Sequence, residues 1–154
     1  MAQGEEHGYH FGGDVYQRIE LSENGLDCRI VPASDPVGEG TYNAAEFTPA
    51  LIKDGEKIED SFWTGEQPRA CFGTSTQGIY MLVIEGRYPD EGIRGTSVNT
   101  CSDILLAYGC RNALNMDGGS SAILWYDGEY VTQSSSSFLR YTGGRPLPNA
   151  WVYG

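Results

Sequence analysis

The sequence predicts an α+β fold: a single domain over residues 1–154, with a mixed, mostly antiparallel, twisted β-sheet and one main helix packed on it. The length of 154 residues is near that of one domain, and a hydrophobic content of 40% is enough to build a core. Glycine (21 residues) and tyrosine (10) are abundant, and only 20% of residues are charged, which favours a turn-rich β-containing fold. Short apolar runs recur between turn residues, and only one segment has helical spacing.

The first third of the chain predicts short strands. Residues 1–13 are expected to form a loose entry segment. Residues 15–21 alternate as a strand does and end at an Asn-Gly turn, so residues 28–31 are expected to return as the hairpin partner. Residues 47–53 predict another strand, and Pro49 favours an edge position because proline cannot donate a hydrogen bond to a neighbouring strand.

Two further strands are expected at residues 69–73 and 79–85. Residues 80–84 are apolar almost throughout. Because a strand with two apolar faces is usually covered on both, we expect residues 79–85 to lie in the centre of the sheet.

Between residues 96 and 108 the spacing of the apolar side chains changes to that of a helix. Four side chains recur at intervals of three and four residues, namely Cys101, Ile104, Leu105 and Tyr108. Hydroxyl side chains before this stretch can cap the helix, and Gly109 can end it. We therefore expect the main helix at about residues 97–108.

The last third predicts strands at residues 112–116 and 122–126, on either side of an Asp-Gly-Gly turn. A run of serines at residues 134–137 predicts a solvent-exposed loop. Residues 149–153 are expected to form a short closing strand.

The turn at Asp117 is the first candidate site. Alternation along a strand would project Asn115 and Asp117 from the same face, pairing an amide with a carboxylate at a strand end. Gly118 and Gly119 permit positive φ angles and close approach of the main chain, which can form an anion-binding concavity beside two hydroxyls, those of Ser120 and Ser121. The alternative is a plain Asp-Gly hairpin turn, which spacing alone favours by about two to one.

Arginines form the second candidate site. Arg87 follows the apolar strand together with Glu85, and Arg69 begins the neighbouring strand. Guanidinium groups bind phosphate oxygens in a bidentate manner, so arginines at one sheet rim would suit a phosphodiester. The alternative is that Arg87 pairs with a nearby carboxylate on the surface, and Arg145, before the last predicted strand, has the same ambiguity.

Charge and residue usage exclude several functions. A net charge of −11 argues against sequence-independent binding to nucleic acid or anionic lipid. We expect no membrane span and no signal peptide in this chain. The two histidines, His7 and His10, cannot build a three-histidine metal site, and the four cysteines lack the spacing of a zinc site, so we expect no metal and no cofactor. A disulfide between Cys28 and Cys71 stays open.

Five segments, taken in order, resemble the motifs of the phosphodiester glycosidase family, which includes the enzyme that removes N-acetylglucosamine from its phosphodiester link to mannose. The resemblance covers residues 40–154. In front of these residues the family usually has an Asn-Gly-x-Phe-Phe strand, and the nearest run in this chain, residues 7–11 (His-Gly-Tyr-His-Phe), departs from that pattern. The resembling segments are Phe47 to Gly55, Pro68 to Gly73, Ile84 to Arg87 (with Glu85 where the family has Asp), Gly109 to Ser121, and Arg145 to Ala150.

The resemblance implies hydrolysis of a sugar-1-phosphodiester at the anomeric carbon. Asp117 would be the central carboxylate and Glu85 the second, because an oxocarbenium-like transition state needs a carboxylate to stabilise or attack it. The expected substrate-binding residues are Arg69, Arg87, Asn115, Gly118, Gly119, Ser120, Ser121 and Arg145. The substrate would be a small-molecule or polysaccharide glycosyl phosphodiester.

Two other functions remain compatible with the sequence. The same scaffold could bind a glycan or phosphate without catalysis, or it could serve in the assembly of a larger envelope or virion structure, for which an exposed apolar patch would be the sign. Family members generally work outside the cytosol, so the resemblance implies an extracellular or cell-envelope location. The oligomeric state is not predicted.

Overall fold

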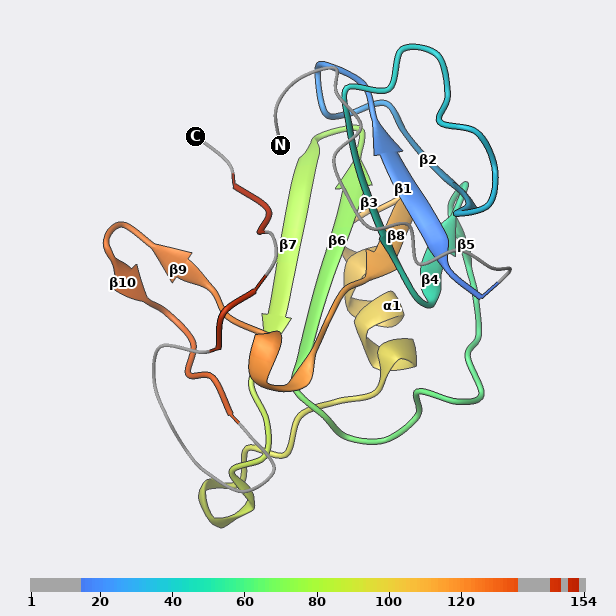
Figure 1. Ribbon diagram of the computed structural model, residues 1–154. Helices are drawn as coiled ribbons and strands as arrows, with labels where there is room; N and C mark the ends of the chain where they lie inside the picture. Colours follow the sequence, from blue (N-terminus) through green and yellow to red (C-terminus); the bar gives the residue numbers. More distant parts are fainter. Residues whose placement is uncertain (1–14, 136–144, 148–149, 153–154) are drawn as a thin grey trace.

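The computed structural model describes residues 15–135, 145–147 and 150–152. A five-stranded sheet lies at its centre, with one helix and a three-stranded sheet on its two faces (Figure 1). Every strand pair between described residues is antiparallel, which confirms the predicted α+β class. In spatial order, the five-stranded sheet contains β5 (Glu56–Lys57), β4 (Ala50–Lys53), β8 (Asn112–Asn115), β6 (Arg69–Ser75) and β7 (Gly78–Ile84).

The three-stranded sheet begins the described chain. β1 (Gln17–Leu21) is its central strand and pairs with β2 (Cys28–Pro32) as the predicted hairpin, and with β3 (Asn43–Phe47) on its other side. A separate two-stranded hairpin, β9 (Trp125–Tyr126) and β10 (Glu129–Tyr130), projects from the body of the molecule (Figure 1).

Side chains of the central sheet alternate between two cores. On β6, Cys71 packs toward the helix while Phe72 packs toward the three-stranded sheet, and on β8 Ala113 and Leu114 divide in the same way. Phe72 also stacks on Trp151, with ring centroids 4.1 Å apart. Both faces of the sheet are therefore covered, which explains why the middle residues of β6 and β8 are apolar on both faces.

The main helix is α1 (Val98–Ala107), which confirms the predicted helix with slightly tighter bounds. The Ser97 side chain caps it by accepting a hydrogen bond from the Thr100 amide, and Gly109 follows its end with a φ of 78°. Its buried side chains Val98, Cys101 and Leu105 face the central sheet. Among the described residues, no helix combines the length and apolar composition required to cross a membrane.

Two strand positions differ from the prediction. β7 is the last strand of its sheet and not a central one, yet its side chains contact both cores, so its apolar sequence reflects coverage on two faces. Residues 47–53 form two strands separated by a cis Thr48–Pro49 peptide, and β4 lies between β5 and β8. Pro49 is not within a strand, so its missing N–H costs no ladder hydrogen bond, and the edge prediction was wrong.

The C-terminal third also departs from the prediction. Only residues 125–126 of the expected strand 122–126 form a strand, and η2 (Gly119–Ser121), a single 3-10 turn, precedes this segment. Ser134 and Ser135 are buried and not solvent-exposed, while residues 136–137 lie outside the described residues. The predicted strand 149–153 falls partly outside them, and residues 150–152 are not strand. The entry segment 1–13 also lies outside.

The structure places the four cysteines as free thiols. Cys71 packs on the helix side of the central sheet, whereas Cys28 packs against the core on the opposite side. The sheet between them explains why the Cys28–Cys71 disulfide, left open by the sequence, is not formed.

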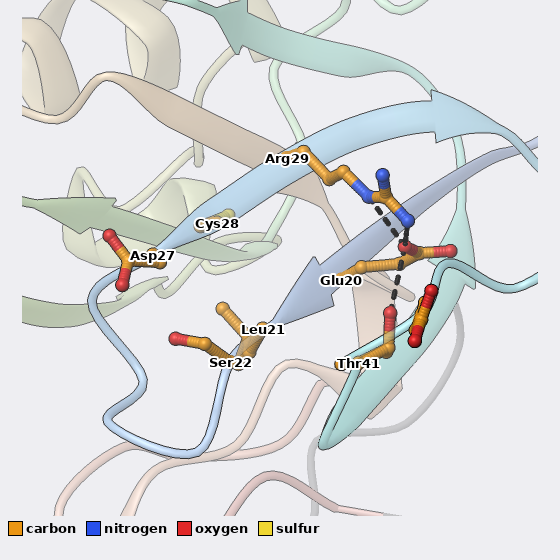
Figure 2. A pocket seen from close by; sticks show the side chains of 9 residues that line it. Glu20, Leu21, Ser22, Asp27, Cys28, Arg29 and Thr41 are labelled. Atoms are coloured by element: carbon orange, nitrogen blue, oxygen red, sulfur yellow. Dashed lines mark hydrogen bonds and ion pairs between the residues drawn. The ribbon is translucent and has the colours of Figure 1, made fainter.

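A buried carboxylate anchors the three-stranded sheet. Glu20 on β1 is 2% exposed and accepts hydrogen bonds from Arg29 (2.7 Å) and Thr41 (3.0 Å), as Figure 2 shows. Arg18, also buried, donates to the same carboxylate at 2.7 Å. Burial alone would raise the pKa of Glu20, but these hydrogen bonds, with one from the Gly38 amide, hold it below its ordinary value.

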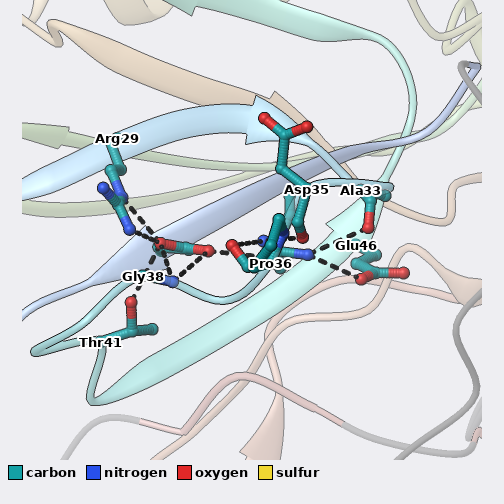
Figure 3. A network of polar contacts seen from close by, with 9 residues as sticks. Arg29, Ala33, Asp35, Pro36, Gly38, Thr41 and Glu46 are labelled. Atoms are coloured by element: carbon teal, nitrogen blue, oxygen red, sulfur yellow. Dashed lines mark hydrogen bonds and ion pairs between the residues drawn. The ribbon is translucent and has the colours of Figure 1, made fainter.

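Arg18 extends this network to the loop between β2 and β3. Its guanidinium donates to the backbone carbonyls of Ala33, Asp35 and Pro36 at 2.8 to 3.0 Å, and it pairs with Glu46 at 3.5 Å (Figure 3). The loop is therefore tied to β1 by charge-assisted hydrogen bonds.

Candidate functional site

The loop after β8 brings the main chain close to the start of β6. The Gly119 amide donates to the Pro68 carbonyl at 2.9 Å, and a Cβ on Gly118 would lie 2.6 Å from the same oxygen. Gly119 has a φ of 58°. Glycine is required at both positions, one for close approach and one for backbone conformation. The alternative of a plain hairpin turn is not what the structure shows, because β8 pairs with β4 and β6 and not with the chain after the turn.

Asp117 and Ser121 at this loop share one arginine. Arg145 Nη2 lies 2.6 Å from Asp117 Oδ2, and Arg145 Nε and Nη2 donate to Ser121 Oγ at 2.9 and 2.7 Å. Ser121 is buried, whereas the side chains of Asp117 and Arg145 are 51% and 49% exposed. The carboxylate and the guanidinium are thus held in place and still accessible to a ligand.

Arg87 lies against the glycine turn as well. Its two terminal nitrogens would each be 3.1 Å from a Cβ on Gly119, and its Nε donates to Gln67 Oε1 at 2.8 Å. Within the described part of the chain, the terminal nitrogens have no hydrogen-bond partner. Arg87 also has a φ of 67°, a left-handed backbone conformation that is uncommon outside glycine. Its guanidinium therefore presents donors that an anion could accept.

Glu85 directly follows β7, and a hydrogen bond joins its side chain to the segment before residue 135. Its Oε1 accepts a hydrogen bond from the Gln133 amide at 2.6 Å. Tyr88 Oη donates to the Ser134 carbonyl at 2.7 Å, and Ser134 Oγ donates to the Ser120 carbonyl at 2.7 Å. Ser134 thus connects the rim after β7 to the glycine turn.

Two expected site residues point elsewhere. Arg69 is 5% exposed and donates to the carbonyls of Thr96, Trp63 and Gly65 at 3.0, 3.3 and 2.9 Å. Burial lowers the pKa of Arg69, and its guanidinium lies 5.9 Å from the centre of the Trp63 ring. Arg69 therefore anchors the loops that precede β6 and α1.

Asn115 is also buried, at 2% exposure. Its Nδ2 donates to the Thr48 carbonyl at 2.7 Å, and the Cys71 thiol lies 3.9 Å from its Oδ1. β8 ends at Asn115, so the strand alternation that would align it with Asp117 does not continue to that residue. The structure therefore gathers Asp117, Ser121, Arg145, Gly119 and Arg87. Ser120 lies in the same turn, and Glu85 is linked to this turn through residues 133–134.

The sequence matches the phosphodiester glycosidase family over residues 3–153. The chain belongs to this family. The match extends in front of the motifs, which begin near residue 40. None of the curated proteins matches the sequence.

One solved structure shares the fold of this chain. The catalytic domain of zebrafish N-acetylglucosamine-1-phosphodiester alpha-N-acetylglucosaminidase, auto-inhibited by its pro-peptide, superposes with a TM-score of 0.69 at 16% identity. The alignment covers 91% of this chain and 52% of that one. A hypothetical protein from Synechocystis gives a TM-score of 0.46 at 20% identity, over 81% of this chain and 32% of the other. The chain thus spans about half the length of the zebrafish structure.

Three residues of the candidate site were not predicted from the sequence: Gln67, Tyr88 and Ser134. Gln67 holds Arg87, and the other two join the rim to the glycine turn. Tyr88 directly follows the Glu-Gly-Arg motif, so its position in the sequence could have identified it as a site residue. Ser134 lies in a serine run whose composition indicates an exposed loop, and nothing in the sequence pointed to its burial.

A hollow of about 270 Å³ lies on the three-stranded sheet, away from these residues. Its lining includes Glu20, Arg29 and Thr41, and the carboxylate of Glu20 is already occupied by hydrogen bonds from the other two (Figure 2). The hollow shares no residue with the cluster around Asp117. We therefore place the candidate site at the cluster around Asp117 and not at this hollow.

Proposed function

We propose that the protein hydrolyses a glycosyl phosphodiester at the anomeric carbon of the sugar. The observation that carries the proposal is the convergence of Arg87, Asp117 and Arg145 on one glycine turn, from three separate parts of the chain. Two cations and one accessible carboxylate match a substrate that contains both a phosphate and an anomeric centre. Family membership supports the same chemistry.

The phosphate would bind between Arg87 and Arg145. Among the described residues the terminal nitrogens of Arg87 have no hydrogen-bond partner, and Arg145 is half-exposed beside Ser121. A guanidinium pair of this kind can contact two phosphate oxygens at once. Gly118 and Gly119 keep the turn free of side chains, so a ligand can approach its backbone closely.

The carboxylates would act on the sugar. Asp117 would stabilise or attack the positive charge that develops at the anomeric carbon, and Glu85 would serve as the second carboxylate, acting on the incoming water. Water adds to the anomeric carbon while the bond from that carbon to the phosphate oxygen breaks. The products are the free sugar and a phosphomonoester. Because the phosphate departs as a stable anion, the reaction demands less of a general acid than an ordinary glycoside does.

The remaining expected residues would support this centre. Ser121 and Ser120 shape the turn, while Arg69 and Asn115 hold β6 and β8 beneath it. The group on the far side of the phosphate would be a small molecule or a polysaccharide. We also propose an extracellular or cell-envelope location, following the family resemblance.

A fluorogenic sugar-1-phosphodiester tests the proposal. We expect turnover of this compound, and no turnover of the matched glycoside that lacks the phosphate. Asp117→Asn and Arg87→Gln should each reduce kcat/KM by about 100-fold or more. Glu56→Gln, which changes an exposed carboxylate on β5, is the matched control and should leave turnover intact.

Hydrolysis in ¹⁸O-labelled water identifies the bond that breaks. The label should enter the sugar, because water attacks carbon; label in the phosphate would mean phosphorus attack and would refute the proposal.

A second candidate function follows from the ion pair between Arg145 and Asp117, which already neutralises the carboxylate. Tight calorimetric binding of the intact diester without any turnover would favour a binding domain instead of an enzyme.

A further inference from the structure

The β9–β10 hairpin presents aromatic side chains to solvent. Trp125, Tyr126 and Tyr130 are 61%, 73% and 54% exposed. In the part of the chain that the structure describes, the hairpin is a separate two-stranded sheet, and neither core includes these side chains. Trp125 is paired with Tyr130 across the two strands, so both side chains project from one face of the hairpin. We call these two residues the aromatic face; exposed apolar groups of this kind often mark a binding site.

Both ends of the hairpin are joined to the glycine turn of the candidate site. Trp125 follows Ser121 by four residues, and Tyr130 precedes Ser134 by four. Four residues of fully extended chain span no more than about 14 Å. Ser134 Oγ also donates to the Ser120 carbonyl at 2.7 Å, which fixes the second end to the turn. The aromatic face therefore lies within the length of a short oligosaccharide from the candidate site.

The area of the aromatic face suits a small ligand and not a protein partner. One aromatic side chain buries about 150 to 250 Å² when it is fully covered. At their observed exposures, Trp125 and Tyr130 together offer on the order of 250 Å². A stable protein interface buries about 800 Å² on each partner. A second copy of this chain would therefore need a much larger surface, whereas a sugar ring would not.

The charges on the hairpin favour an uncharged ligand. Residues 122–133 contain two carboxylates, Asp127 and Glu129, and no lysine or arginine. A phosphate would find no cation here. A pyranose ring whose hydroxyls are equatorial presents a face of C–H groups, which carry a slight positive charge and stack on the negative face of an aromatic ring. Asp127, exposed in the turn of the hairpin, can accept hydrogen bonds from sugar hydroxyls.

We propose that the β9–β10 hairpin is a glycan-binding surface, on which an uncharged pyranose ring with equatorial hydroxyls stacks against Trp125 and Tyr130. This surface is separate from the proposed phosphate contacts of Arg87 and Arg145, and it would keep a glycan chain beside the glycine turn. Binding at the hairpin requires no turnover, so this inference does not depend on the proposed enzyme activity.

NMR titration of the ¹⁵N-labelled full chain with cellotetraose and with maltotetraose tests the proposal. Both sugars are uncharged chains of such rings, and they differ in linkage. The chain has three tryptophans, each with one indole N–H signal. We expect the Trp125 signal, identified by its loss in Trp125→Tyr, to shift with a Kd of about 1 mM or below for at least one sugar. The Trp63 and Trp151 signals should stay in place.

Variants locate the contact. Tyr130→Ala should raise the Kd read from the Trp125 signal by about fivefold or more, because half of the aromatic face is lost. Phe62→Ala is the matched control: it removes an aromatic side chain that is 88% exposed but lies between β5 and β6, and it should leave the Kd unchanged. Inorganic phosphate, added alone, should not shift the Trp125 signal. The wild-type titration needs no variant, so it stands if a variant fails to fold.

Two results would overturn the proposal. One is a Trp125 signal that neither sugar shifts, or a Kd that is equal in wild type and Tyr130→Ala. The other is a wild-type dimer in analytical ultracentrifugation that Trp125→Ala converts to monomer, which would assign the hairpin to a contact between copies of the chain. Sugar binding at Trp125 without turnover of any phosphodiester would support this inference and refute the proposed function, and turnover without any sugar-induced shift would do the reverse.

Discussion

Arg145 and Asp117 are 28 residues apart in the chain, yet Arg145 Nη2 lies 2.6 Å from Asp117 Oδ2. The same guanidinium holds Ser121 through two nitrogens, at 2.9 and 2.7 Å. A planar group with several donors can satisfy both partners at once, whereas an ammonium group provides a single point of charge. The relationship therefore depends on the shape of arginine and not only on its charge.

Arg145→Lys should retain the charge but lose this arrangement. We expect kcat/KM for a sugar-1-phosphodiester to fall by about tenfold or more, because Asp117 and Ser121 lose their common anchor. Stability should change by less than about 1 kcal/mol, since the ion pair is half-exposed. Steady-state kinetics and thermal unfolding measure the two effects. Arg94→Lys, at an exposed position, is the matched control, and equal kinetics in both variants would contradict the prediction.

Gly119→Ala should impair the site more than the fold. Its φ of 58° disfavours alanine by about 1 kcal/mol, and the new Cβ would press on the guanidinium of Arg87 at 3.1 Å. We expect kcat/KM to fall by about tenfold as Arg87 is displaced.

Gly128→Ala provides the comparison for this prediction. Gly128 has a φ of 88° but no atom within 4 Å of a Cβ, so alanine there meets backbone strain without crowding. Both variants should lose similar stability in denaturant unfolding, and only Gly119→Ala should lose activity. Full activity of Gly119→Ala would show that the position of Arg87 over the turn is unimportant.

The variant Arg69→Lys tests whether Arg69 has a structural role or binds phosphate. Lysine cannot reproduce the hydrogen bonds to three backbone carbonyls, so we expect a loss of about 2 kcal/mol in the free energy of unfolding. KM for the phosphodiester should change by less than about twofold, because the side chain is buried away from the turn. A large increase in KM with unchanged stability would instead restore Arg69 to the phosphate site.

The sequence predicted the elements with strong local signals. The helix at residues 97–108 had apolar side chains on one face and capping residues at its ends, and the β1–β2 hairpin had an Asn-Gly turn. Position within the sheet was harder to predict. β7 is apolar because helix and sheet cover its two faces, and the sequence cannot distinguish this from a central strand.

The candidate site was predicted in part for a related reason. Motifs identify residues near the turn, but the direction of each side chain depends on where its strand ends. β8 ends at Asn115, which turns that amide inward and leaves Asp117 exposed. The burial of Ser134 and the inward direction of Arg69 arise from long-range packing, for which the local sequence carries no signal.

Glu20→Gln should weaken the fold in a pH-dependent way. The folded pKa of Glu20 is lowered, so the unfolded state takes up a proton first as the pH falls. The stabilisation from its charge is therefore fully present above the ordinary carboxyl pKa of about 4.3 and is lost as the pH drops through the lower folded value. At neutral pH, glutamine leaves the buried Arg18 with only the longer contact to Glu46 as a carboxylate partner, and we expect a loss of about 3 kcal/mol.

Denaturant unfolding of both proteins from pH 7 to pH 3 measures this dependence. The difference in the free energy of unfolding between wild type and Glu20→Gln should be constant near neutrality and should narrow below about pH 4. Glu39→Gln changes an exposed carboxylate at the edge of the same hollow, and it should follow the wild-type curve. Parallel curves for wild type and Glu20→Gln down to pH 3 would mean that Glu20 is not held ionised by Arg18 and Arg29, because only a carboxylate with a lowered folded pKa produces convergence in acid.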